Sequence, residues 1–131
     1  MFSTGVVSKE GNIDHVVTQY LYPGGPVVQA EGSWLLTEGF NMAFTLLCER
    51  ATIDFNLARG KGALQITSRG KKHRMLVPTD TDGYNAELRY FVNCVARGER
   101  PSVVTAQDSV TVLEILHAEE KSVRSGKPVA L

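Results

Sequence analysis

The sequence predicts an α+β fold: a mostly antiparallel, open-faced sheet of about six strands with two C-terminal helices packed on one face. Runs of β-branched and aromatic residues, separated by turns rich in glycine and proline, fill the chain up to residue 77. Two amphipathic segments with clear ends fill the rest from residue 84. Consecutive strands joined by short turns favour antiparallel pairing, and helices that follow the strands are typical of the α+β class.

The clearest strand signal is a hairpin. The run HVVTQYLY at 15–22 and the run VVQAEGSWLL at 27–36 flank the turn PGGP, which interrupts both strands and helices. Residues 1–11 hold one short apolar pair and are either an edge strand or a loose lead-in. The remaining strands are predicted at about 41–49, 51–57, 63–69 and 73–77.

The first helix is predicted from an apolar stripe at the 3.6-residue period. Gly98 is a natural left-handed stop, and Pro101 prevents the helix from resuming. The stripe consists of Tyr84, Leu88, Phe91, Val92 and Val95. Such a helix cannot bury its apolar stripe alone, so we expect it to cover one face of the sheet.

The second helix begins at a capping signal. Thr105 can accept hydrogen bonds from the free N–H groups of the first turn, and Asp108 suits the positive end of the helix dipole. Gly126 ends the helix, and the residues after it form a short extended tail. Its predicted apolar face consists of Val112, Leu113, Leu116 and Val123.

Length and composition indicate a single domain, residues 1–131, with a real core. The 14 basic and 14 acidic residues cancel, which argues against nucleic acid or an anionic membrane as partner. No apolar run approaches the ~18 residues of a membrane span. Cys48 and Cys94 lie in apolar runs, so we expect buried free thiols in a reducing, cytoplasmic compartment.

Several chemical motifs fail on spacing. The acidic segment DTDGYNAE at 80–87 lacks the glycine and glutamate positions of a calcium loop. The basic cluster at 69–74 has no interleaved aromatic residues for base stacking, and a solvated hairpin tip is the favoured interpretation. The three histidines share no metal-ligand spacing, and the fingerprint G-x-G-x-x-G is absent. The sequence therefore predicts no catalytic residue, no metal ligand and no cofactor-binding residue in this chain.

The helical half resembles the C-terminal domain of the glucose–fructose oxidoreductase, inositol dehydrogenase and rhizopine-catabolism (Gfo/Idh/MocA) family. The matching motifs are Y-x-x-E-L-x-x-F from Tyr84, G-x-x-P from Gly98, Asp108, L-x-I-x-x-A from Leu113, Ser122, and G-x-x-V-x-L from Gly126. The strand pattern before residue 84 matches more loosely, so the resemblance covers nearly the whole chain.

The resemblance implies a two-domain NAD(P)-dependent oxidoreductase that acts on sugars, polyols and related compounds. In that family, an N-terminal Rossmann domain binds NAD or NADP, and the catalytic motifs Glu-Lys-Pro and Asp-x-x-x-His lie outside the region matched here. Neither motif occurs in these residues, so no catalytic role transfers. The chain then looks like a substrate-binding and oligomerisation fragment whose partner is its own Rossmann domain.

The resemblance also suggests substrate-binding residues. In related dehydrogenases, an aromatic residue after a glycine at the start of the third strand can face the sugar, and Gly39-Phe40-Asn41 fits that position. Phe40 is equally compatible with a core position. Glu38 and Trp34 are further candidates on the same loop.

The predicted sheet leaves one face open, and an apolar open face marks a partner surface. We therefore expect a homo-oligomer through that face, as is common in the family. Two alternatives stay open: a free-standing, non-catalytic binding or assembly module, and a protein of the same architecture whose N-terminal half is a pseudoenzyme.

Overall fold

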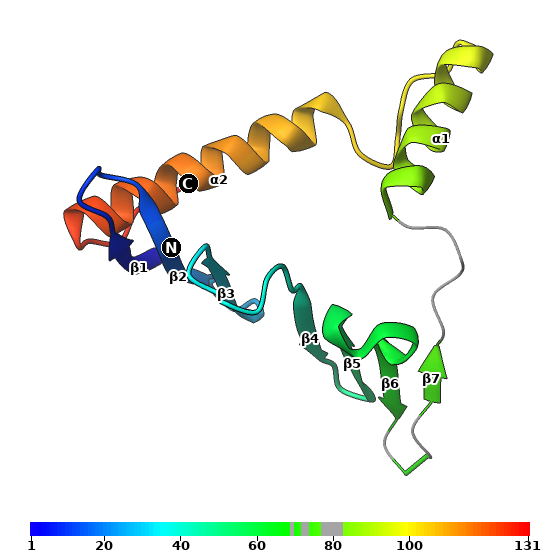
Figure 1. The fold of residues 1–131 in the computed structure, drawn as a ribbon, viewed down its shortest axis with the longest axis horizontal. Helices are drawn as coiled ribbons and strands as arrows, with labels where there is room; N and C mark the ends of the chain where they lie inside the picture. The colour runs from blue at the N-terminus through cyan, green and yellow to red at the C-terminus, as the bar shows by residue number, and fades with distance from the viewer. Residues whose placement is uncertain (69, 72–73, 77–82) are drawn as a thin grey trace. The chain divides into compact units, whose positions relative to one another are not determined.

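The computed structural model describes residues 1–68, 70–71, 74–76 and 83–131. Antiparallel strands and two helices are both present, which confirms the predicted α+β class (Figure 1). The chain divides into two compact units, one made of 1–37 with 101–131 and the other of 38–100. The first and last segments of the chain therefore fold together, and the middle segment forms a unit of its own.

The first unit contains a three-stranded antiparallel sheet in the order β1-β2-β3. Its strands are β1 (Phe2–Val7), β2 (Ile13–Leu21) and β3 (Val27–Ser33). The predicted hairpin is confirmed as β2 and β3, which pair from His15 opposite Ser33 to Leu21 opposite Val27. Of the two alternatives for the N-terminal segment, the edge strand is the one that forms.

A single long helix, α2 (Ala106–Ser125), packs on β1 and β2. Its contact face is built on the small residues Ala118 and Ser122, which are buried. Small side chains on the helix allow its backbone to approach the sheet closely. Only the C-terminal half of α2 makes this contact, and Val112, Leu113 and Leu116 of the predicted apolar face are exposed.

The capping signal of α2 is confirmed. The Thr105 hydroxyl accepts a hydrogen bond from the backbone N–H of Asp108 at 3.2 Å, and the Asp108 carboxylate accepts one from the N–H of Thr105 at 2.7 Å. The hydrogen bonds from Thr105, through its hydroxyl and its backbone, lower the pKa of Asp108. Gly126 ends the helix with φ of 65°, as expected for a left-handed stop.

Three buried hydroxyl groups join the helix to the sheet. Ser3 and Thr18 lie opposite each other on β1 and β2, and their hydroxyls share a hydrogen bond of 2.8 Å. The Ser122 hydroxyl of α2 accepts a hydrogen bond from the backbone N–H of Ser3 at 2.9 Å and donates one to the carbonyl of Lys127 at 2.8 Å. Because each buried hydroxyl has a partner, the polar contact carries no desolvation penalty of an unpaired group.

The extended C-terminal tail pairs with the start of the chain. The Met1 ammonium donates to the carbonyl of Val129 at 2.7 Å, and the N–H of Val129 donates to the carbonyl of Met1 at 2.9 Å. Together with the Ser3–Ser122 bond, this reciprocal pair occupies the edge of β1 that does not face β2.

The second unit contains a four-stranded antiparallel sheet in the order β4-β5-β6-β7. Its strands are β4 (Ala43–Leu47), β5 (Ala51–Asn56), β6 (Leu64–Ser68) and β7 (Arg74–Leu76). A short 3₁₀ helix, η1 (Leu57–Gly62), connects β5 to β6. The N–H of Asn56 donates to the carbonyl of the buried Ala63 at 2.9 Å and closes this connection.

This sheet has one apolar and one polar face, since successive strand residues point to opposite sides. The polar face carries Thr45, whose hydroxyl donates to Asp54 at 2.9 Å, and Asp54 also pairs with Arg59. On the other face, the rings of Phe44 and Phe55 stack with centroids 5.4 Å apart. The apolar face consists of Phe44, Leu46, Ile53, Phe55, Leu64 and Ile66.

The prediction of one sheet of about six strands is wrong in its connectivity, because seven described strands form two separate sheets. The break falls between β3 and β4, where residues 34–42 form no strand. Gly39 has φ of 87°, a conformation that interrupts an extended chain. The segment around Gly39 therefore lies between two sheets, whereas we expected a single sheet.

The predicted packing of the helices on the sheet is observed for α2, which contacts β1 and β2. The first helix in chain order, α1 (Gly83–Arg97), has the predicted limits, and Gly98 follows it with φ of 65°. However, its apolar stripe is exposed, from 79% for Tyr84 to 54% for Phe91. Cys94, beside the stripe, is the buried residue of α1.

The two cysteines differ in burial. Both are free thiols, but Cys48 is exposed and only Cys94 is buried, so the expectation of two buried thiols is wrong for Cys48. Cys48 lies directly after β4 at a tight turn, which its N–H closes by donating to the carbonyl of Ala51 at 2.9 Å. The apolar run before it therefore indicated a strand and not a buried site.

We expect Ser122→Ala to destabilise the first unit by about 1–3 kcal/mol, because the substitution leaves the buried N–H of Ser3 without its acceptor. Urea unfolding followed by circular dichroism measures the change in the free energy of unfolding. The matched control is Ser125→Ala on the same helix, whose exposed hydroxyl donates to the carbonyls of Lys121 and Ser122 within that helix. Equal effects of the two substitutions would contradict the role given to Ser122.

Candidate functional site

The segment that holds Glu38, Phe40 and Asn41 is a short loop fixed at its C-terminal end. The side-chain oxygen of Asn41 accepts a hydrogen bond from the N–H of Ala58 at 3.1 Å. The carbonyl of Met42 accepts one from the N–H of Leu57 at 2.9 Å. Both bonds tie the loop to the start of η1, so the residues just before β4 have a defined backbone path.

Phe40 is exposed on this loop, with 82% of its surface accessible. This exposure does not agree with the alternative interpretation, in which Phe40 is a core residue. An exposed ring on a fixed backbone offers a flat apolar surface of the kind that stacks on the carbon-bound hydrogens of a sugar or polyol. Glu38, two residues earlier, is also exposed. Its carboxylate can accept hydrogen bonds from hydroxyl groups.

Asn41 has a structural role that the sequence did not reveal. The N–H of Ala58 lies within hydrogen-bond distance of two side-chain oxygens, that of Asn41 at 3.1 Å and that of Asn56 at 3.0 Å. Two amides thus share one donor at the N-terminus of η1. The remaining polar group of Asn41 is its NH₂, a donor that suits a ligand hydroxyl.

Trp34 belongs to the first unit, whereas Glu38, Phe40 and Asn41 belong to the second. The indole is 87% exposed, and the backbone N–H of Trp34 donates to the carbonyl of Asp14 at 2.8 Å. The structure therefore describes the four candidate residues as two groups, and their convergence on one substrate stays a prediction.

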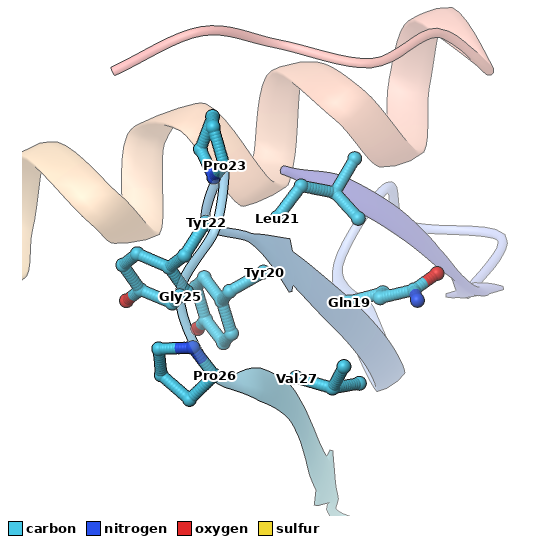
Figure 2. A pocket seen from close by; sticks show the side chains of 8 residues that line it. All are labelled: Gln19, Tyr20, Leu21, Tyr22, Pro23, Gly25, Pro26 and Val27. Atoms are coloured by element: carbon cyan, nitrogen blue, oxygen red, sulfur yellow. The ribbon is translucent and has the colours of Figure 1, made fainter.

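A cleft of about 230 Å³ lies at the turn between β2 and β3 (Figure 2). Tyr20 lies in its wall, and the hydroxyl of Tyr20 donates to the carboxylate of Glu119 at 2.6 Å. Burial, and then this hydrogen bond and the Glu119 charge, raise the pKa of Tyr20, which keeps the phenol protonated. The lining residues are Gln19, Tyr20, Leu21, Tyr22, Pro23, Gly25, Pro26 and Val27.

From the sequence, this segment was predicted only as a turn. The aromatic and proline residues YLYPGGP that flank the turn are the signal that could have indicated an apolar cleft. With a protonated phenol and otherwise mostly apolar walls, the cleft can make contacts with a ligand but has no acid–base pair.

A second, shallower hollow of about 420 Å³ lies at the turn between β4 and β5. Its polar lining includes Arg50, Thr52, Ser68 and Lys71. Lys71 is the member of the predicted basic cluster whose surroundings the structure describes. Arg69, Lys72 and His73 lie outside the described residues, and so does the side chain of Arg74.

Neither a metal centre nor a membrane span is found in the part of the chain that the structure describes. No group of three or more His, Cys, Asp or Glu side chains there is arranged to hold a metal ion. Among the same residues, neither helix is both long and apolar enough to cross a bilayer.

Comparison with known proteins gives one significant similarity among curated sequences. The chain is 25% identical over 124 residues to scyllo-inositol 2-dehydrogenase (NAD(+)) from Bacillus subtilis strain 168. The similarity covers 92% of this chain but only 36% of the dehydrogenase, so the chain spans about a third of that protein. No family model matches the chain, and no solved structure is significantly similar.

The shared donor at Ala58 generates a test of the loop. We expect Asn41→Ala and Asn56→Ala each to cost less than about 0.5 kcal/mol, because the other amide still caps the N–H, and the double substitution to cost about 1–2 kcal/mol. Hydrogen exchange of the Ala58 amide measures the local effect. Simple additivity of the two single changes would show that the amides do not share the donor.

Proposed function

We propose that this chain is the substrate-binding and oligomerisation part of an NAD(P)-dependent sugar or polyol dehydrogenase. The observation that carries the proposal is the similarity of 92% of the chain to a part of an NAD⁺-dependent inositol dehydrogenase. The motif resemblance from Tyr84 onward points to the same family.

The cofactor belongs, in this proposal, to another part of the complete protein. The sequence has no G-x-G-x-x-G fingerprint, and every described strand pairing is antiparallel, so the chain contains no βαβ unit for a dinucleotide among its described residues. These residues do not fit NAD or NADP. We therefore assign no hydride-transfer step to any residue of this chain.

The substrate role rests on the loop at 38–42. The exposed ring of Phe40 supplies an apolar surface. The Glu38 carboxylate can accept hydrogen bonds, and the Asn41 NH₂ group can donate them. Polyols and sugars combine apolar carbon faces with many hydroxyls, so this set of groups matches their chemistry. The two hydrogen bonds that fix the loop to η1 reduce the entropy lost when a ligand binds.

Binding to the isolated chain tests this proposal. We expect no micromolar binding of NADH by calorimetry, and weak, millimolar binding of scyllo-inositol or a related polyol that shifts NMR signals of Phe40 and Asn41. Phe40→Leu removes the ring but keeps apolar bulk, and we expect it to weaken polyol binding about tenfold.

The matched control is Tyr84→Leu, which removes an exposed ring from α1 and should leave polyol binding unchanged. Micromolar NADH binding would contradict the proposal that the cofactor binds to another part of the complete protein. A set of shifts confined to the cleft of Figure 2 would move the substrate role away from Phe40.

The oligomerisation role rests on the apolar face of the β4–β7 sheet. Phe44 and Leu46 on this face are 46% and 51% exposed, and the central residues Ile53 and Ile66 are only partly buried. Contiguous exposed apolar surface of this kind marks an interaction site in soluble proteins. We propose that two copies associate through it.

Neighbouring residues on β6 allow a matched test of the face. We expect Ile66→Lys to weaken self-association at least about tenfold, because it places a charge in the centre of the apolar face. Thr67→Lys puts the same charge on the opposite, polar face and should have little effect. Sedimentation equilibrium measures both, and equal behaviour of the two variants would exclude the apolar face as the contact.

A further inference from the structure

We propose that β4 is a dimerisation edge, which pairs antiparallel with β4 of a second copy of this chain about a two-fold axis at Thr45. The inference needs only the sheet of the second unit. It does not depend on the proposed enzymatic family, and it concerns the edge of the sheet and not its apolar face.

The other edge strands are protected, and β4 is not. The C-terminal tail pairs along β1 through Met1 and Val129, β3 carries Glu31 and Gly32, and β7 is only three residues long. In contrast, β4 has the sequence AFTLL, without charge, proline or glycine, and all five residues are exposed. Natural proteins protect edge strands with charges, short length or a cover, because an open edge invites pairing. The absence of such protection within β4 indicates that the edge is covered by a partner.

The hydrogen-bond pattern shows which groups of β4 face outward. The N–H of Cys48 donates to Ala51 and that of Leu57 donates to Met42, so the even-numbered residues of this segment form the bonded pairs with the neighbouring strand. Hydrogen-bonded and non-hydrogen-bonded pairs alternate in an antiparallel ladder. The N–H and C=O groups of Ala43, Thr45 and Leu47 therefore point away from β5, and no described strand pairs with them.

These three residues are spaced for pairing with themselves. With Thr45 opposite Thr45 of the second copy, Ala43 lies opposite Leu47, and every outward N–H and C=O of the strand gains a partner. Phe44 then lies opposite Leu46 of the second copy as a close, non-hydrogen-bonded pair. Both side chains point to the apolar face, so the stacked Phe44 and Phe55 rings extend into one continuous apolar surface across the dimer.

Charge favours the same partner. When the register is continued past the strand ends, Glu49 lies toward Asn41 of the second copy and Arg50 toward Phe40, so no like charges are opposed. The acid nearest the edge on the polar face, Asp54, is already paired with Arg59. A highly charged partner would find no complementary group on this edge, whereas a second AFTLL strand matches it along its whole length.

A contact of one short strand buries little area, so the dimer is expected to be weak and dependent on concentration. It is compatible with association through the apolar face, because an edge and a face are different surfaces. Two independent two-fold contacts would give tetramers, whereas the edge alone gives dimers.

Residue-specific hydrogen exchange of the 131-residue chain, at about 20 µM and about 1 mM, tests the register directly. We expect the amides of Ala43, Thr45 and Leu47 to gain protection with concentration, and those of Phe44 and Leu46 to stay protected at both. Protection of the outward amides that does not change while the chain dimerises would overturn the proposal.

Substitution of the central residue gives a second test. Thr45→Pro removes one outward N–H from each copy and the hydroxyl bond to Asp54, but it keeps the backbone hydrogen bonds to β5, and proline is tolerated at such an edge position. We expect it to weaken dimerisation at least about tenfold in sedimentation. The control Thr45→Val loses the hydroxyl bond to Asp54 but keeps the N–H, and it should dimerise like the unsubstituted chain.

Comparison of Thr45→Pro with Ile66→Lys distinguishes association through the β4 edge from association through the apolar face. Loss of dimers in Thr45→Pro, with dimers kept in Ile66→Lys, supports the edge alone. Dimers kept in Thr45→Pro, or a chain that is monomeric at about 1 mM, contradict the edge contact while leaving the polyol and cofactor tests of the proposed function untouched.

Discussion

The Ser122 hydroxyl joins β1 to the tail after α2, and residues near the two ends of the chain belong to one unit. One oxygen accepts from β1 and donates to the tail after α2, and the Met1–Val129 pair continues the connection. Because residues near both termini are joined, the segment between β3 and α2 is a loop whose two ends are both held by the first unit. The cost of closing such a loop grows only slowly with its length, so residues 38–100 are free to fold as a unit of their own.

The same contact buries little apolar surface. The helix approaches the sheet through Ala118 and Ser122 and meets Ser3 and Thr18, so the most buried contacts are small and polar. Such a contact fixes geometry well but removes little apolar area from water, which is the main source of folding free energy. Many of the larger apolar side chains of α1, of the first half of α2 and of the second sheet are exposed.

Local signals predicted local structure well. The hairpin at PGGP, the limits of both helices and the roles of Thr105, Gly98 and Gly126 follow from rules that act within a few residues, and all are confirmed. The connection between strands was not predictable in the same way. Whether Gly39 joins two strands of one sheet or separates two sheets depends on where the next strand finds its partner, and that is not encoded in the turn itself.

The candidate site shows the same division. The sequence pointed to Phe40, the aromatic residue after Gly39, as a candidate. It did not predict the hydrogen bonds that fix the loop to η1. Asn41 reaches an N–H seventeen positions away in sequence, and the shared use of that N–H with Asn56 appears only when β4 and β5 are in register. The outward orientation of Ala43, Thr45 and Leu47 likewise follows from the register and not from residue types.

The two proposed roles of the second unit meet at one point of the chain. The loop that presents Phe40 leads directly into β4, and the Met42–Leu57 bond belongs to the same ladder that sets which groups of β4 face outward. A second copy paired along β4 would extend that ladder toward Asn41 and restrict the loop further. Ordering the loop in advance lowers the entropy that a bound polyol must overcome, so assembly and substrate contact would reinforce each other through the backbone.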